Sequence, residues 1–228
     1  MTAPLLPPSF LFRFSAPCRY KTPLWSDKGA CLDESYRLLS LAELDGRLLF
    51  AEFRIAWSEQ GLAFAVRVTG KRQAPWCRES RPDDSDGVRI WLDTRDTRNI
   101  HRASRFCHQF AFLPAGAGRS LDEPVGEQLL INRAKENAKP VRPGVLAAHR
   151  EKRVDGYLLE GYIPAATLTG FDPAEHPRLG FTYAVIDREL GEQAFASGEF
   201  PYRDDPSLWS TLELVRPSAD DKPQRDSR

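Results

Sequence analysis

Residues 49–69, LFAEFRIAWSEQGLAFAVRVT, contain two runs in which apolar side chains recur at every second position. In the first run Phe53, Ile55 and Trp57 share one face, and the second run begins after Gly61. A period of two is typical of a β-strand with one buried face. Gly61 supplies a residue that tolerates positive φ at the turn between the runs. The stretch therefore predicts a β-hairpin.

The same kind of pattern continues along the chain, with prolines and glycines between the runs. Ile163–Gly170 predicts one helical turn, because Pro164 can occupy the first helical position and Gly170 follows the end. Further strands are predicted at 88–93, 106–112, 129–132, 145–149, 156–163, 179–187, 193–200 and 210–215. Many short strands with turn signals predict an all-β, antiparallel two-sheet β-sandwich with at most one or two short helical turns.

The length of 228 residues fits one such sandwich with extensions at both ends. We expect a proline-rich N-terminal segment at 1–20, the sandwich at 21–216 and a charged flexible tail at 217–228. A chain of this size buries enough surface to hold a core without a disulfide or a metal ion.

The charges balance, with 32 Lys and Arg against 32 Asp and Glu. A zero sum argues against a general affinity for nucleic acid or for anionic membranes. No apolar run approaches the roughly 18 residues of a membrane span. The N-terminal apolar stretch is broken by prolines and has no basic start, so no secretory signal is predicted. We expect a cytoplasmic protein whose four cysteines are reduced.

Three segments together carry a resemblance to a known family. They are DGVRIWLDTRD at 86–96, EGYIPAATL at 160–168 and RLGFTYAVID at 178–187. In this order they resemble the family 9 carbohydrate-binding modules and the wider DOMON-like superfamily of sugar-binding and haem-binding sandwiches. The resemblance covers about residues 25–214. It implies a sandwich in which two aromatic side chains clamp a sugar and polar groups bind its hydroxyls.

Aromatic side chains in turn-rich segments are the candidates for such a clamp. Trp76 follows Pro75, and Trp209 follows a turn-rich stretch that also lies close to Tyr202. Flat aromatic faces suit the C–H side of a sugar ring. The alternative for each residue is a plug at the end of the core. Trp57 continues an apolar alternation and is predicted to be buried, and Trp91 is assigned to a second layer or a binding surface.

The most polar stretch lies between the third and fourth predicted strands. Guanidinium groups form forked hydrogen bonds to carboxylates, hydroxyl pairs or phosphate. One interpretation is a polar floor for the ligand, made by Arg95, Arg98, His101 and His108. The other is a mesh of ion pairs with Asp93, Asp96 and the acidic cluster of Asp83, Asp84 and Asp86.

No metal site is assigned, because His101, Cys107 and His108 lack the spacing of a structural zinc site. The resemblance leaves calcium open as a cofactor without naming its ligands. Haem ligation by methionine is not expected, since the only methionine is Met1.

The sequence therefore predicts a non-catalytic protein that binds a carbohydrate or a related polyhydroxylated ligand. One alternative is a protein-interaction domain that kept the sandwich and lost the sugar site. Another is a hydrolase using Glu160 and Asp187 as paired carboxylates, although these positions belong to the framework segments and no nucleophile motif is present.

Overall fold

The computed structural model describes residues 12–41, 46, 48–196 and 200–217, and its regular structure is almost entirely β. The strands are β1 (Ser15–Tyr20), β2 (Ala51–Ser58), β3 (Gly61–Thr69), β4 (Gly87–Asp93), β5 (Cys107–Ala117), β6 (Glu123–Leu129), β7 (Ala147–Arg153), β8 (Gly156–Pro164), β9 (Arg178–Asp187), β10 (Gly191–Ala194) and β11 (Ser210–Val215). The 3-10 turns are η2 (Glu34–Tyr36), η4 (Pro82–Asp84), η5 (Ala165–Thr167) and η6 (Pro206–Leu208). The all-β class is confirmed, with more helical turns than predicted.

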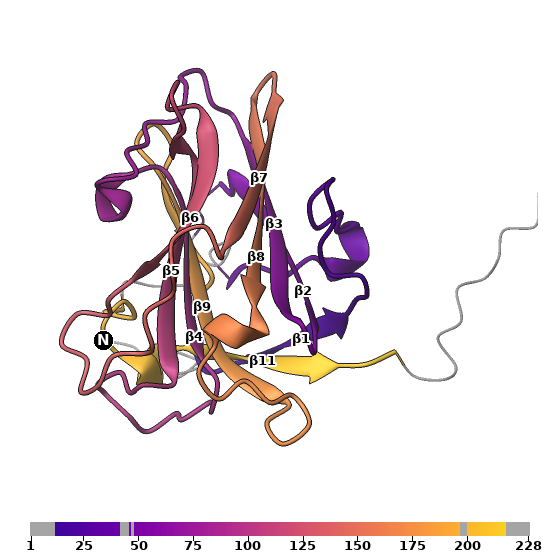
Figure 1. Ribbon diagram of the computed structural model, residues 1–228, viewed down its shortest axis with the longest axis vertical. Helices are drawn as coiled ribbons and strands as arrows, with labels where there is room; N and C mark the ends of the chain where they lie inside the picture. The colour runs from indigo at the N-terminus through magenta and orange to yellow at the C-terminus, as the bar shows by residue number, and fades with distance from the viewer. Residues whose placement is uncertain (1–11, 42–45, 47, 197–199, 218–228) are drawn as a thin grey trace, which may run out of the picture.

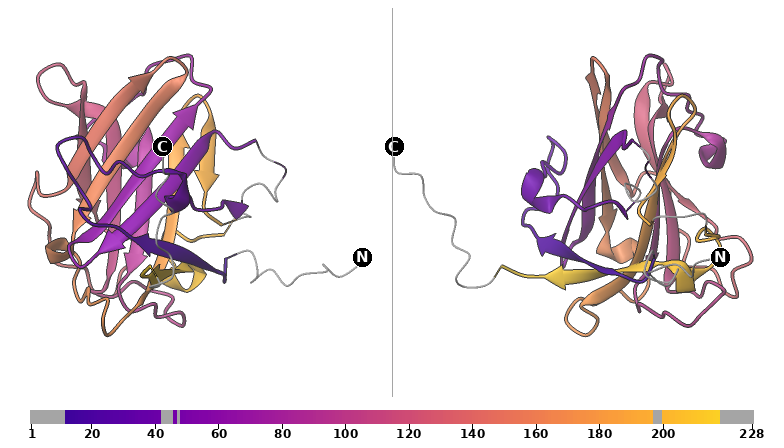
Figure 2. Two further views of the ribbon diagram at one scale, coloured as in Figure 1. Left: turned by 90° about the vertical axis from the view of Figure 1, so that its right-hand side faces the viewer. Right: turned by 180° about the vertical axis from the view of Figure 1, so that it is seen from behind.

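One sheet contains all of these strands, in the order β6-β5-β4-β9-β11-β1-β2-β3-β8-β7, with β10 paired to β9. It folds into two facing layers, which β1 and β11 join by crossing at one end (Figure 1). Figure 2 shows the layer of β2, β3, β7 and β8 face-on in its left view. The edge strands β6 and β7 approach each other, and no ladder joins them within the described residues.

Strand β1 makes this sheet mixed. It pairs in parallel with β11 on one side and with β2 on the other. The predicted antiparallel two-sheet sandwich is therefore only partly right, because the two layers are halves of a nearly closed sheet. β1 was not predicted, since its six residues include Pro17 and show no clear alternation. It also places Ser15–Tyr20, from the segment predicted as proline-rich, inside the sheet.

Aromatic side chains fill the space between the layers. Phe53 of β2 stacks on Tyr183 of β9 with ring centroids 4.0 Å apart. Phe64 of β3 meets Phe112 of β5 edge-on at 4.7 Å. These are the inward positions of the alternating pattern, so the hairpin predicted at 49–69 is confirmed as β2 and β3. Gly61 has φ +134° at the turn, as its place in the pattern requires.

A second apolar cluster covers the outer face of β4 and β9. Trp91 packs there against the segments that carry Cys107, Ile131 and Trp209. For this reason every residue of β4 is buried, including the polar Arg89 and Asp93. Of the two places predicted for Trp91, the second layer is confirmed.

Other strand ends differ from the prediction for identifiable reasons. β5 continues through Pro114, where its register with β6 shifts, because a proline offers no N–H to the ladder. β6 lies at 123–129 rather than 129–132, and β10 covers only the beginning of the predicted 193–200 strand. Residues 197–199 lie outside the described residues, as does the predicted tail beyond 217. Among the residues described, no helix has the length and apolar character to cross a membrane.

Candidate functional site

A cavity of about 670 Å³ is lined by residues from the turns of the β5–β6 and β7–β8 hairpins. The β7–β8 hairpin turns at the top of Figure 1. We call this cavity the hairpin-end cavity. Three segments line it: the chain after β3, the β5–β6 turn and the β7–β8 hairpin. Its lining residues are Lys71, Arg72, Gln73, Ala74, Pro75, Ala115, Ser120, Leu121, Asp122, Arg150, Lys152, Arg153, Val154, Gly156 and Tyr157. Its volume lies within the range of small-molecule sites.

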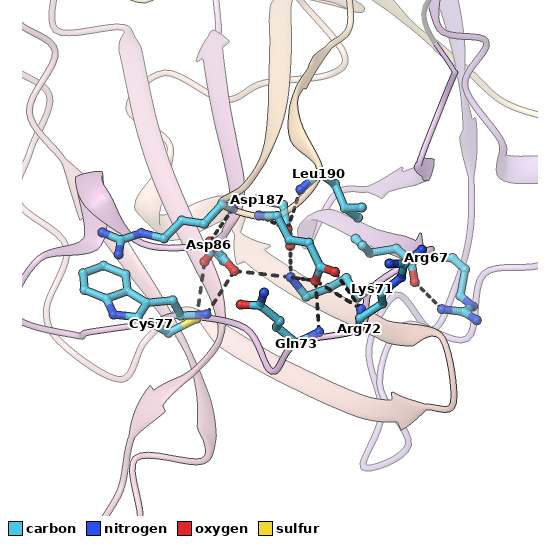
Figure 3. Close-up of polar contacts among 12 residues, drawn as sticks. Arg67, Lys71, Arg72, Gln73, Cys77, Asp86, Asp187 and Leu190 are labelled. Carbon is cyan, nitrogen blue, oxygen red and sulfur yellow. Dashed lines mark hydrogen bonds and ion pairs between the residues drawn. The ribbon is translucent and has the colours of Figure 1, made fainter.

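A buried lysine anchors the first of these segments. The Lys71 ammonium forms an ion pair with Asp187 at the end of β9, and it lies 3.5 Å from the Oδ2 of Asp86. Figure 3 shows Lys71 between these two carboxylates. Glu189 is more distant, with its Oε2 3.9 Å from the ammonium. The cluster ties the chain after β3 to the ends of two strands of the opposite layer.

The three carboxylates also accept hydrogen bonds from backbone amides of the loops around them. Asp86 accepts from the amides of Trp76 at 3.0 Å and Arg188 at 2.9 Å. Asp187 accepts from the amides that follow it at 189 and 190. Glu189 accepts from the amides of residues 72 and 73. These bonds fix the backbone of the cavity rim on this side.

Ion pairs between two hairpins form the facing wall. Arg150 of β7 donates from Nη2 to the carbonyl oxygen of Asp122 at 3.1 Å and to its Oδ1 at 2.9 Å. Lys152, two positions along β7, donates to Oδ2 of the same carboxylate at 2.8 Å. Hydrogen bonds from Lys152 and then Arg150 lower the pKa of Asp122 to about 2. The Asp122 carboxylate therefore stays ionised over the whole range of ordinary pH.

Tyr157 closes the cavity toward the core. Its ring belongs to the buried cluster between the layers, and it also lines the cavity. Its hydroxyl is buried and has no hydrogen-bond partner within the described residues. Burial, followed by the charges of Asp187 and Asp86, raises its pKa well above the ordinary value. The group is thus a protonated donor without an acceptor.

Trp76, the first predicted clamp residue, ends the segment that begins at Lys71. The ring is partly buried, and the Arg188 guanidinium lies 3.3 Å from its centroid. Arg78 lies 5.0 Å from the same centroid. Trp76 is therefore near the rim, with arginine already stacked on it. A ligand-stacking role for Trp76 stays a prediction.

Trp209 and Tyr202 are both buried in the second apolar cluster, together with Trp91. The Trp209 indole donates to the carbonyl of Tyr202 at 2.7 Å. Neither ring offers a free face to a sugar, so the structure does not bring these two residues together with Trp76 in a clamp. The packing is that of the alternative weighed for them, a plug on the core. Turn-rich sequence around Trp209 had suggested exposure, whereas the β4–β9 face supplies its burial.

The four predicted polar residues lie at the opposite end of the sheet from the hairpin-end cavity. Arg95 donates to the carbonyl of Gly170 at 2.9 Å, and Arg98 pairs with Asp96 at 3.4 Å. His101 is exposed and its Nδ1 lies 3.1 Å from the Oδ2 of Asp205.

His108 is buried, and its Nε2 accepts from the amide of Thr169 at 3.1 Å. Burial lowers its pKa to about 4, so the ring is neutral at pH 7. The partners of the four predicted residues are backbone groups of loops and neighbouring carboxylates. They correspond in part to the predicted mesh of ion pairs. Asp86, from the acidic cluster assigned to that mesh, lies instead at the cavity end with Lys71. Ligand binding by the four residues stays a prediction.

The described residues contain no group of three or more His, Cys, Asp or Glu side chains arranged to hold a metal ion. Glu160 and Asp187, the carboxylates considered for hydrolysis, have separate partners. Glu160 accepts from the amide of Cys31 at 2.9 Å and lies 3.0 Å from Nδ1 of His149. Asp187 pairs with Lys71.

The residues that line the cavity were not singled out by the sequence. Tyr157 looked like one more inward strand residue, and the basic run at 150–153 looked like a hairpin turn. One signal was present: Arg150 and Lys152 are two positions apart, so their side chains share a face of a strand.

Comparisons with known proteins identify the fold. No protein-family model matches the chain, and no curated protein matches it. Two solved structures of a family 9 carbohydrate-binding module from Caldicellulosiruptor kristjanssonii are similar to it. The complex with cellotriose is 14% identical with a TM-score of 0.57, covering 92% of this chain and 97% of that chain. The complex with glucose is 15% identical with a TM-score of 0.59, covering 92% and 100%.

At this identity the likeness establishes the fold alone. The chain has a fold like that of family 9 carbohydrate-binding modules, as the resemblance of its three segments implied. Membership of the DOMON-like superfamily stays a prediction.

Proposed function

We propose that this protein binds carbohydrate, without catalysis, in the hairpin-end cavity. The observation that carries the proposal is a 670 Å³ cavity on this fold, with a buried tyrosine hydroxyl that lacks a partner. The similar structures are modules in complex with cellotriose and with glucose, which supports a sugar as the ligand class.

The lining suits a small polyhydroxylated ligand. Pro75, Leu121 and Val154 supply apolar surface for the C–H side of a ring, and the last two are exposed. Gln73 and Ser120 each offer a donor and an acceptor for hydroxyl groups. Trp76, at the end of the same segment, is the candidate for stacking at the rim if Arg188 moves aside.

The test is calorimetric titration with glucose and short glucans, comparing the wild type with Tyr157→Phe. Removing a buried hydroxyl that has no partner should leave stability unchanged or slightly higher. If this hydroxyl meets the ligand, affinity should fall by at least about tenfold.

The matched control is Tyr162→Phe. The Tyr162 hydroxyl donates to the carbonyl of Gln60 at 2.8 Å, at the other end of β8. This variant should keep full affinity. Equal affinity of the wild type and Tyr157→Phe, or loss in both variants, would contradict the placement of the site.

A further inference from the structure

Hydrogen-bond donors dominate the side chains that line the hairpin-end cavity. Its lining includes cationic groups that can only donate: Lys71, Arg72, Arg150, Lys152 and Arg153. Asp122 is the carboxylate among the lining residues, and it can only accept. A neutral sugar offers hydroxyl groups that donate as readily as they accept, so it would meet few acceptors here.

The existing ion pairs do not balance every one of these cations. Lys71 has Asp187, and Arg153 has Glu151 as its own partner. Arg150 and Lys152, by contrast, share the single carboxylate of Asp122. The β7 wall of the cavity therefore carries one positive charge more than its partner neutralises.

Arg150 is more enclosed than Lys152, with a side chain only 8% exposed. Its Nη2 makes both bonds to Asp122, which leaves Nε and Nη1 without a hydrogen-bond partner among the described residues. A guanidinium with free donors on a cavity wall is suited to forked bonds with a carboxylate, sulfate or phosphate group.

We propose that the cavity selects a sugar that carries an acidic group, and that Arg150 and Lys152 bind that group. This inference rests on the proposed function and names its ligand class. By the same count, Asp187 and Asp86 share the single Lys71 ammonium, so the negative charges near Tyr157 are not fully neutralised and the acidic group is assigned to the β7 wall.

The test compares four ligands by calorimetry on the full chain: glucose, glucuronate, glucose 6-phosphate and inorganic phosphate. Glucuronate or glucose 6-phosphate should bind at least about tenfold more tightly than glucose. The difference should shrink when the ionic strength rises from about 0.01 M to about 0.15 M. The two acidic sugars distinguish a carboxylate from a phosphate ester.

Lys152→Gln supplies the variant, because this side chain is 69% exposed and its removal should not impair folding. It should weaken binding of the acidic sugar by about fivefold or more, and by a larger factor than it weakens binding of glucose. Arg105→Gln is the control, since it removes the same charge from an exposed position ahead of β5, at the other end of the sheet.

Equal affinity for glucose and the acidic sugars would overturn this inference while leaving carbohydrate binding intact. Inorganic phosphate binding as tightly as glucose 6-phosphate would overturn it as well, since the site would then recognise an anion without its sugar. Failure of every sugar, acidic or neutral, would overturn the proposed function together with the inference.

Discussion

Lys71 and Asp187 form an ion pair in which both side chains are almost completely excluded from water, at 3% and 0% exposure. The two residues come from opposite layers of the sheet. Replacing Lys71 by Met should cost about 3–5 kcal/mol of the free energy of unfolding, because the Asp187 carboxylate would remain buried without its partner. Urea denaturation measures this, with the exposed Lys135→Met as control. A loss below about 1 kcal/mol would contradict the structural role of the pair.

Two tryptophans that looked equivalent in the sequence should respond differently to truncation. Trp209→Ala should cost about 3–5 kcal/mol, because its ring is buried and its indole bonds the Tyr202 carbonyl. Trp76→Ala should cost about 1 kcal/mol, since it loses mainly the stacking of arginine on a partly buried ring. Equal losses in urea denaturation would show that Trp76 is also part of the core.

His108 should make stability depend on pH. Its pKa is about 4 in the folded protein and 6.5 in the reference state, so the unfolded chain binds the proton more readily. The contribution of the neutral His108 to the free energy of unfolding is complete above pH 6.5. It is lost as pH falls from 6.5 toward 4, by about 3 kcal/mol in total.

The measurement is the free energy of unfolding between pH 7 and pH 4 for the wild type and His108→Gln. The variant should lose less stability over this interval than the wild type does. His176→Gln, which replaces a more accessible imidazole, is the control and should follow the wild type. Parallel curves for wild type and His108→Gln would refute this assignment.

Replacing Gly161 by any larger residue should destabilise the protein. A Cβ at this position would lie 2.3 Å from Cε1 of Phe64, on the adjacent strand β3. Gly161→Ala should therefore cost about 1–3 kcal/mol through crowding of the core. The double variant with Phe64→Leu should lose less free energy of unfolding than the two single variants lose together, because the smaller side chain makes room. Simple additivity would indicate that the two positions are not in contact.

Local patterns predicted the strands that pack with one face on the core. The 49–69 hairpin and the strands at 88–93, 179–187 and 210–215 were all confirmed, since the side chains that point between the two layers are apolar at every second position. The same local patterns did not predict which strands become neighbours in the sheet. The pairing of β1 with β11 joins residues nearly 200 positions apart, and no local feature of Pro17 or its neighbours specifies it.

The candidate site was harder to predict than the fold. The local sequence of Trp209 suggests exposure, whereas the residue is buried in the second apolar cluster. The alternation around Tyr157 predicts an inward residue but does not show that this residue also borders a cavity. Exposure of an aromatic residue depends on what the rest of the chain places over it. Charge pairing posed the same problem, because Lys71 finds its partner 116 residues further along the chain.

The position of β11 between β9 and β1 affects when this protein can fold during synthesis. A nascent chain that has not yet released Ser210–Val215 from the ribosome has two facing strand edges with nothing between them. Both layers can form hairpins earlier, but the link between them has to wait for this late segment. We therefore expect the growing chain to depend on protection of those edges until Ser210–Val215 has left the ribosome.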